Sequence, residues 1–104
     1  MHTDGHAQRD SATQFVLPAN LNLRAAQQLK QDLLLLLEET GPVSVDAQAV
    51  NRLSTAAVQV LTAFVLELEQ RRRQVEFARP SETFRNGFDT LGLSHIIMRA
   101  QVSP

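Results

Sequence analysis

The chain has 104 residues, of which 43% are hydrophobic, so it is long enough for one domain with a core and too short for two. Ten basic and eleven acidic residues give a net charge of −1, which provides no electrostatic attraction for nucleic acid or for anionic membranes. There is no cysteine, which excludes disulfides, thiolate metal sites and cysteine nucleophiles.

The N-terminal residues 1–12 are polar and show no periodicity, and we predict a disordered tail there, followed by one domain over 13–104. The tail has neither the basic region nor the apolar centre of a signal peptide. The longest apolar run, Leu33–Leu37, is too short to cross a bilayer. We therefore expect a cytoplasmic protein with no direct membrane insertion.

The first half of the domain predicts a strand followed by a helix. Phe15–Leu17 is a short apolar run that Pro18 ends, which is typical of a strand. Asn22 then precedes an apolar stripe at helical spacing, and Gly41–Pro42 is a stop signal for that helix. The stripe consists of Ala25, Ala26, Leu29, Leu33, Leu36 and Leu37.

The second half repeats this order. Val43–Ala47 and Gln74–Ala78 predict two more strands, and the chain between them carries a helical stripe that ends at Arg71–Arg73. A last helix is predicted between a Ser81 cap and a Gly92 stop, and the apolar residues 93–98 form a short helix or an edge strand. Alternating strands and helices predict an α/β fold, a mainly parallel mixed sheet of about four strands with helices packed on it.

Ser54 and Thr55 stand where the second strand and its loop lead into the second helix. Unpaired backbone N–H groups and the helix dipole at such a place favour a side-chain oxygen or an added negative charge. Ser54 is therefore expected to cap the helix while Thr55 points outward, and a phosphate on Thr55 would be tolerated. Asp46, at the end of the preceding strand, either forms a turn or orients this loop by accepting backbone N–H groups.

From about Phe15 to Ile97 the sequence resembles the STAS domain family of anti-sigma factor antagonists and sulfate-transporter tails. The resemblance is most specific in Val43–Asp46, Leu53 and the hydroxyl-led helix start, and it continues through Phe77–Ser81 and the following helix. The segment Leu17–Ala26 is similar to the short branch of the family that is linked to chemotaxis or to ABC transporters.

In the family, an Asp, a Ser or Thr and a Gly mark the loop, and the hydroxyl accepts phosphate from a partner kinase. The resemblance implies that Thr55 is the phosphoacceptor, with Ser54 at the Asp place and Ala57 at the Gly place. Asp46, Ser54, Ala56 and Ala57 would then form the docking loop. The resemblance implies a protein partner, which is an anti-sigma factor or serine kinase, a transporter subunit or a chemotaxis protein.

Two functions follow from this resemblance. The first is a partner-switching regulator in bacterial signal transduction, controlled by phosphorylation at Thr55. The second is an unphosphorylated adaptor subunit of a phospholipid-transport ABC complex or a chemotaxis system, which the altered Asp and Gly places favour slightly. A small enzyme is the weakest hypothesis, because the sequence has no phosphate-binding Gly-rich loop, no paired carboxylates and no nucleophile–histidine arrangement.

Some leucines, arginines and histidines outside the motif have both a structural and a functional interpretation. Leu34, Leu35 and Leu66 fall off the apolar stripes, so neighbouring elements cover them, or solvent does, or they form an interface with a partner or a second copy. Arg71–Arg73 suits the C-terminal dipole of its own helix better than a nucleic-acid site. The three histidines, His2, His6 and His95, are too scattered for metal-ligand spacing, and we expect no metal and no cofactor.

Overall fold

Three parallel strands form the centre of the structure, a computed structural model that describes residues 12–100. The tail predicted over 1–12 therefore lies outside the described residues, except for Ala12. The elements are β1 (Thr13–Val16), β2 (Asn20–Leu21), α2 (Leu23–Leu37), β3 (Val43–Asp46), β4 (Arg52–Leu53), α3 (Thr55–Gln70), β5 (Val75–Ala78), α4 (Glu82–Thr90) and α5 (Ser94–Arg99).

The main sheet has the order β1-β3-β5, and its register places Phe15, Val45 and Phe77 side by side. The α/β class and the parallel strands confirm the sequence prediction, but the sheet has three strands, and β2 and β4 form a separate parallel pair. The difference has a local cause. Pro18 has no N–H to donate to a ladder, so β1 stops before it and the chain starts a second, two-residue pairing farther on.

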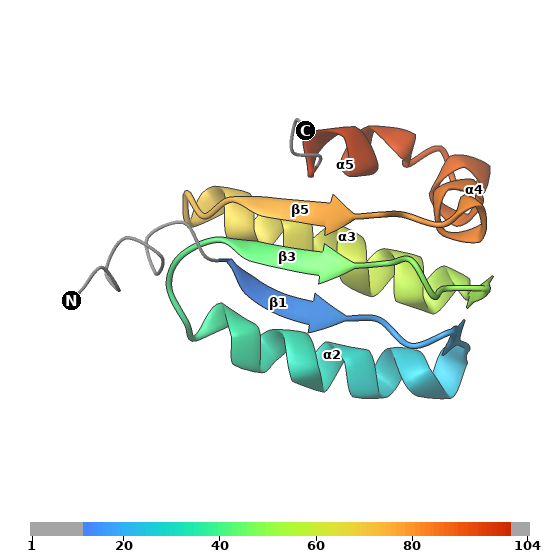
Figure 1. Ribbon diagram of the computed structural model, residues 1–104, viewed down its shortest axis with the longest axis horizontal. Helices are drawn as coiled ribbons and strands as arrows, with labels where there is room; N and C mark the ends of the chain where they lie inside the picture. Colours follow the sequence, from blue (N-terminus) through green and yellow to red (C-terminus); the bar gives the residue numbers. More distant parts are fainter. Residues whose placement is uncertain (1–11, 101–104) are drawn as a thin grey trace.

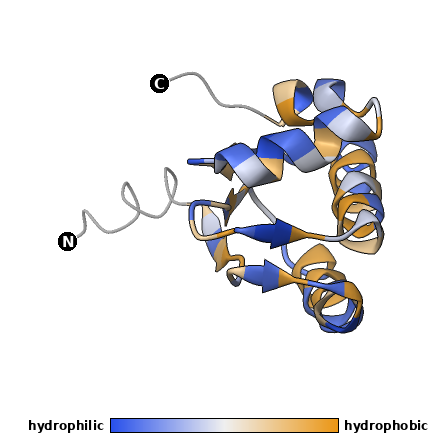
Figure 2. Ribbon diagram, turned by 90° about the vertical axis from the view of Figure 1, so that its right-hand side faces the viewer, coloured by the Kyte–Doolittle hydropathy of each residue, from blue (hydrophilic) through white to orange (hydrophobic). Residues whose placement is uncertain are grey.

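Helices α2 and α3 lie on one face of the sheet, and α4 and α5 gather beyond β5 (Figure 1). This placement follows from two right-handed crossovers in the same direction, β1 to β3 and β3 to β5. Figure 2 views the molecule from the end where the strands stop and shows the hydrophilic side of α2 facing outward. The apolar C-terminal segment predicted over 93–98 is a helix and not an edge strand, since α5 covers Ser94–Arg99 and Leu93 precedes it as the N-cap.

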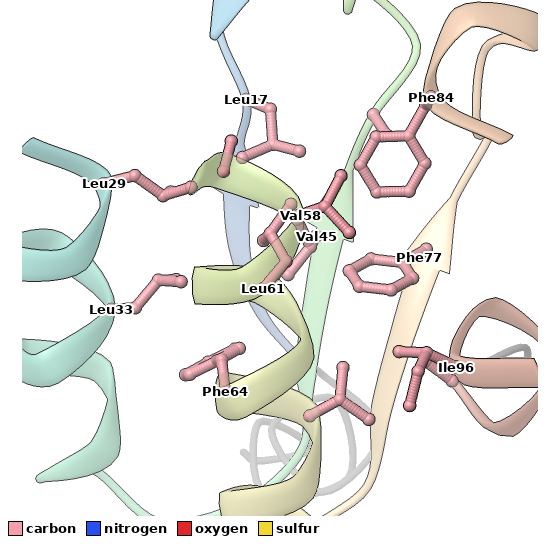
Figure 3. Packing of buried hydrophobic residues seen from close by; sticks show 14 of the residues in the cluster. Leu17, Leu29, Leu33, Val45, Val58, Leu61, Phe64, Phe77, Phe84 and Ile96 are labelled. Atoms are coloured by element: carbon pink, nitrogen blue, oxygen red, sulfur yellow. The ribbon is translucent and has the colours of Figure 1, made fainter. Parts of the chain in front are cut away.

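The core fills the space between the helices and the sheet. In Figure 3, Leu29 and Leu33 of α2 point toward α3, and α3 in turn points Val58 and Leu61 toward Val45 of β3. Each such buried side chain stabilises the fold by roughly 1.5–3 kcal/mol. A second cluster joins β5 to α4, where the rings of Phe77, Phe84 and Phe88 lie with centroids 5.0 to 5.9 Å apart.

The arginines after α3 also cap the end of α2, a role that the sequence did not predict. Arg71 Nη1 donates to the Leu37 carbonyl at 3.0 Å, and Arg73 donates to the carbonyls of Gly41 at 2.8 Å and Leu36 at 3.1 Å. These carbonyls are the unpaired acceptors at the end of α2 and just beyond it. Arg71 is also the C-cap residue of α3 and pairs with Glu67 of that helix, so these arginines interact with the ends of both helices. The packing of α3 beside α2 brings the end of α2 within reach.

No helix among residues 12–100 combines the length and the apolar composition that crossing a bilayer requires.

Candidate docking site at the start of helix α3

Ser54 is the N-cap of α3, as the sequence predicted. Its backbone is extended, with ψ 159°, and its Oγ accepts the backbone N–H of Ala57 at 3.1 Å. Ser54 is half-buried, whereas Thr55, the first residue of the helix, is exposed. The two neighbouring hydroxyls therefore have different surroundings, since one completes the helix end and the other faces solvent.

The first turn of α3 carries no acidic residue. Its positive dipole end is balanced only by the neutral cap from Ser54, whereas the first turn of α4 contains Glu82. A negative charge added at Thr55 would meet unpaired N–H groups and a favourable dipole, without a carboxylate of the same turn to repel it. The start of α3 is thus electrostatically suited to an anionic group, on the protein itself or on a partner.

The loop before Thr55 is held against the segment that connects β1 to α2. The N–H groups of Asn51 and Arg52 both donate to the Ala19 carbonyl, at 2.8 and 3.1 Å, and the N–H of Ser54 donates to the Leu21 carbonyl at 2.9 Å. These bonds fix the backbone immediately before the helix. Thr55 is therefore presented on a rigid base.

Helix α4 holds the same loop from the other side. The Ser81 hydroxyl caps α4 by accepting the N–H of Phe84 at 3.0 Å, and it donates to the Val50 carbonyl at 2.6 Å. Gly87 lies so close to Leu53 that a Cβ at this glycine would stand 2.5 Å from Leu53 Cδ2. Sequence reasoning missed both contacts, although a glycine inside a helical pattern is a signal of close packing.

Asp46 stabilises the turn that follows β3. Its Oδ1 accepts the N–H of Gln48 at 2.9 Å, and its Oδ2 forms an ion pair with Arg79. The N–H of Gln48, followed by the guanidinium of Arg79, lowers the pKa of Asp46 below its usual value. Arg79 has a left-handed backbone, with φ 50°, which is costly for a residue with a Cβ. Within the described residues, no hydrogen bond joins Asp46 to Thr55.

The remaining predicted docking residues differ in exposure. Ala56 is half-buried, but Ala57 is fully buried against the core. Ala57 itself therefore offers no exposed surface to a partner, whereas Ala56 offers part of its side chain.

The three leucines outside the apolar stripes are all exposed, at 48% for Leu34, 65% for Leu35 and 39% for Leu66. Leu34 lines a hollow between α2 and α3, and neither of the other two leucines belongs to that lining. Leu35 lies about 100° farther round α2 than Leu34, which directs it away from the hollow. Leu34 therefore borders the hollow between α2 and α3, whereas Leu35 and Leu66 are exposed outside its lining.

A family model described as Mlab, STAS domain matches residues 5–99, which is most of the chain. The chain belongs to the STAS domain family. No curated protein and no solved structure matches it significantly. STAS domains mediate protein–protein interactions and are typically non-enzymatic, so this STAS domain is a general interaction or regulatory module. Among residues 12–100, no group of three or more His, Asp or Glu side chains is placed to hold a metal ion.

Proposed function

We propose that this STAS domain is a non-enzymatic docking module of the bacterial cytoplasm, whose protein partner binds at the Ser54–Thr55 start of α3. One observation carries the proposal: Thr55 is an exposed hydroxyl on a rigidly held helix start that lacks an acidic residue in its first turn. A partner in close contact there would be sensitive to any charge placed on Thr55. The partner is an anti-sigma factor or serine kinase, a transporter subunit or a chemotaxis protein.

Two modes of action fit this site. In the switch mode, a kinase adds about −1.5 to −2 charges to Thr55, which the helix dipole accommodates but a close partner surface does not. In the adaptor mode, Thr55 stays unmodified and docks directly. The adaptor mode is favoured because Ser54 occupies the acidic place of the family motif and is committed to capping. A kinase that reads a carboxylate there would lose a charge-assisted contact.

The docking proposal is tested by measuring how tightly wild type and Thr55→Glu bind a candidate partner. The candidates are the purified proteins encoded by neighbouring genes that belong to one of the three partner classes. We expect Thr55→Glu to weaken binding by about tenfold, which corresponds to about 1.4 kcal/mol, with an unchanged circular dichroism spectrum. The matched control is Gln70→Glu, which adds the same charge at the exposed far end of the same helix. Equal affinity for wild type and Thr55→Glu would contradict the proposal.

The mode is tested by phosphate incorporation, measured as intact mass after incubation with the neighbouring kinase and ATP. In the adaptor mode, the wild type is labelled slowly or not at all, and Ser54→Asp improves labelling because aspartate caps as well as serine and restores the carboxylate. Rapid stoichiometric labelling that Thr55→Ala abolishes would establish the switch mode. Labelling that persists in Thr55→Ala would place the acceptor elsewhere.

A further inference from the structure

A groove of about 640 Å³ runs between α2 and α3. We call it the α2–α3 groove. It extends along α3 from Ala56, the residue after Thr55, to Arg71 at the end of the helix. Its lining consists of Lys30, Leu33, Leu34, Leu37, Ala56, Gln59, Val60, Ala63, Phe64, Glu67 and Arg71.

The floor of the groove is apolar and shaped for a convex occupant. Leu33 and Phe64 form its buried base, and half-exposed Leu34 forms part of one wall. The wall on the α3 side is shallow at Ala56 and Ala63, which are seven residues apart on the same side of the helix and have small side chains. The stretch from Ala56 to Arg71 is about 22 Å long, which is the length of an α-helix of about 15 residues. Such a helix is about 10 Å across, and its axis could lie at the usual distance of packed helices from α2 and α3.

The charges at the rim are unbalanced. Glu67 is paired with Arg71, with 2.9 Å between Oε2 and Nε. Lys30 stands on the α2 side of the groove, and no ion pair to it occurs within the part of the chain that the structure describes. An occupant with an acidic side chain opposite Lys30 would therefore complete the electrostatics of the rim.

We propose that the α2–α3 groove receives an amphipathic α-helix of a partner protein, with apolar residues along the floor and an acidic residue facing Lys30. Such a helix packs by i, i+3, i+4 and i+7 anchors, as in other helix-in-groove complexes. A second copy fits less well, because a two-fold axis along the groove would set one hollow against another. The proposal rests on the proposed function, since a partner that covers Thr55 reaches the groove at Ala56.

The direct test uses the full chain and a synthetic amphipathic peptide of about 18 residues, roughly 27 Å long as a helix. The peptide carries leucines at i, i+3, i+4 and i+7 and a glutamate beside this stripe, and its counterpart carries lysine in place of glutamate. We expect saturable amide shifts in NMR spectra at Val60 and Ala63. The Lys30→Glu variant should bind the glutamate peptide about fivefold more weakly and the lysine peptide more tightly, because the sign of the rim charge is reversed.

Ala63→Lys, which fills the groove from an exposed position, should abolish these shifts, whereas Leu35→Lys, outside the groove, should not. The proposal is overturned by absent shifts, by equal affinity for both peptides, or by a free protein that sediments as a dimer which Ala63→Lys dissociates. If a partner is lost in Thr55→Glu but kept in Ala63→Lys, the groove proposal fails and the docking function stands. If the groove binds the peptide and Thr55→Glu keeps every partner, the docking function fails alone.

Discussion

Replacing Ser54 and Thr55 one at a time separates the hydroxyl that caps α3 from the exposed hydroxyl that we propose contacts a partner. Ser54→Ala removes the Oγ that accepts the N–H of Ala57 at 3.1 Å and leaves that donor half-buried without its partner. Loss of a serine N-cap costs about 1 kcal/mol, within a range of roughly 0.5–2 kcal/mol. For a domain of this size, 1 kcal/mol lowers the melting temperature by roughly 4–8 °C. Thr55 is exposed, so Thr55→Ala should change the free energy of unfolding by less than about 0.5 kcal/mol.

The assay is urea unfolding followed by circular dichroism, with thermal melts of the same samples. Ser54→Asp is the matched variant, because a carboxylate keeps the capping acceptor and adds a favourable charge at the helix N-terminus. Ser54→Asp should be at least as stable as the wild type. The slope of the unfolding free energy against urea concentration should be the same for all variants. If Ser54→Ala were as stable as the wild type, or if Thr55→Ala lost as much stability, the assignment of the two hydroxyls would be refuted.

Two further predictions concern the surroundings of the site. Because the N–H of Gln48 lowers the pKa of Asp46, the charged carboxylate stabilises the fold fully above its unfolded pKa of about 3.9, and this contribution disappears as the pH falls through the folded value. The difference in unfolding free energy between wild type and Asp46→Asn should therefore be constant above about pH 5 and shrink below about pH 4; a difference independent of pH would contradict this. The Cβ of Gly87→Ala would stand 2.5 Å from Leu53 Cδ2, so the Leu53 side chain must shift, which offsets the roughly 1 kcal/mol that alanine gains in helix propensity. Gly87→Ala should therefore be less stable in urea unfolding than exposed Asn86→Ala on the same helix, where nothing opposes the gain in propensity. Equal stability of these two variants would remove the close-packing argument.

The sequence predicts the elements that depend on local patterns. Periodicity places the helices and the three long strands, and Asn22 and Ser81 are N-caps where a polar residue precedes an apolar stripe. The sequence also predicts which of the two hydroxyls caps α3, because only the residue before the first helical turn, Ser54, has the backbone geometry of an N-cap. These features are predictable because each depends on residues within one turn of the chain.

The features that the sequence does not predict depend on contacts between distant segments. Arg73 caps α2 by donating to the Leu36 carbonyl across 37 residues of chain, which no periodicity of α3 reveals. The same holds for Gly87, whose missing side chain makes room for Leu53. The α2–α3 groove also depends on tertiary structure, because it is lined by residues of both helices. In the sequence, Leu34 is only a leucine outside the apolar stripe, and nothing shows that it borders a groove.

The arrangement of α3 predicts that a charge on its outer surface leaves the fold intact. The contacts that stabilise this helix are the Ser54 cap at its start and the fully buried side chains on its inner side, such as Ala57 and Leu61. Thr55 and Ala63 lie on the outer side and contribute little to that core. A charge on either exposed residue therefore acts mainly on whatever binds there, because the buried contacts that hold the helix stay unchanged. An interaction module needs this separation, since a switch that also unfolded its own domain would remove the surface that it controls.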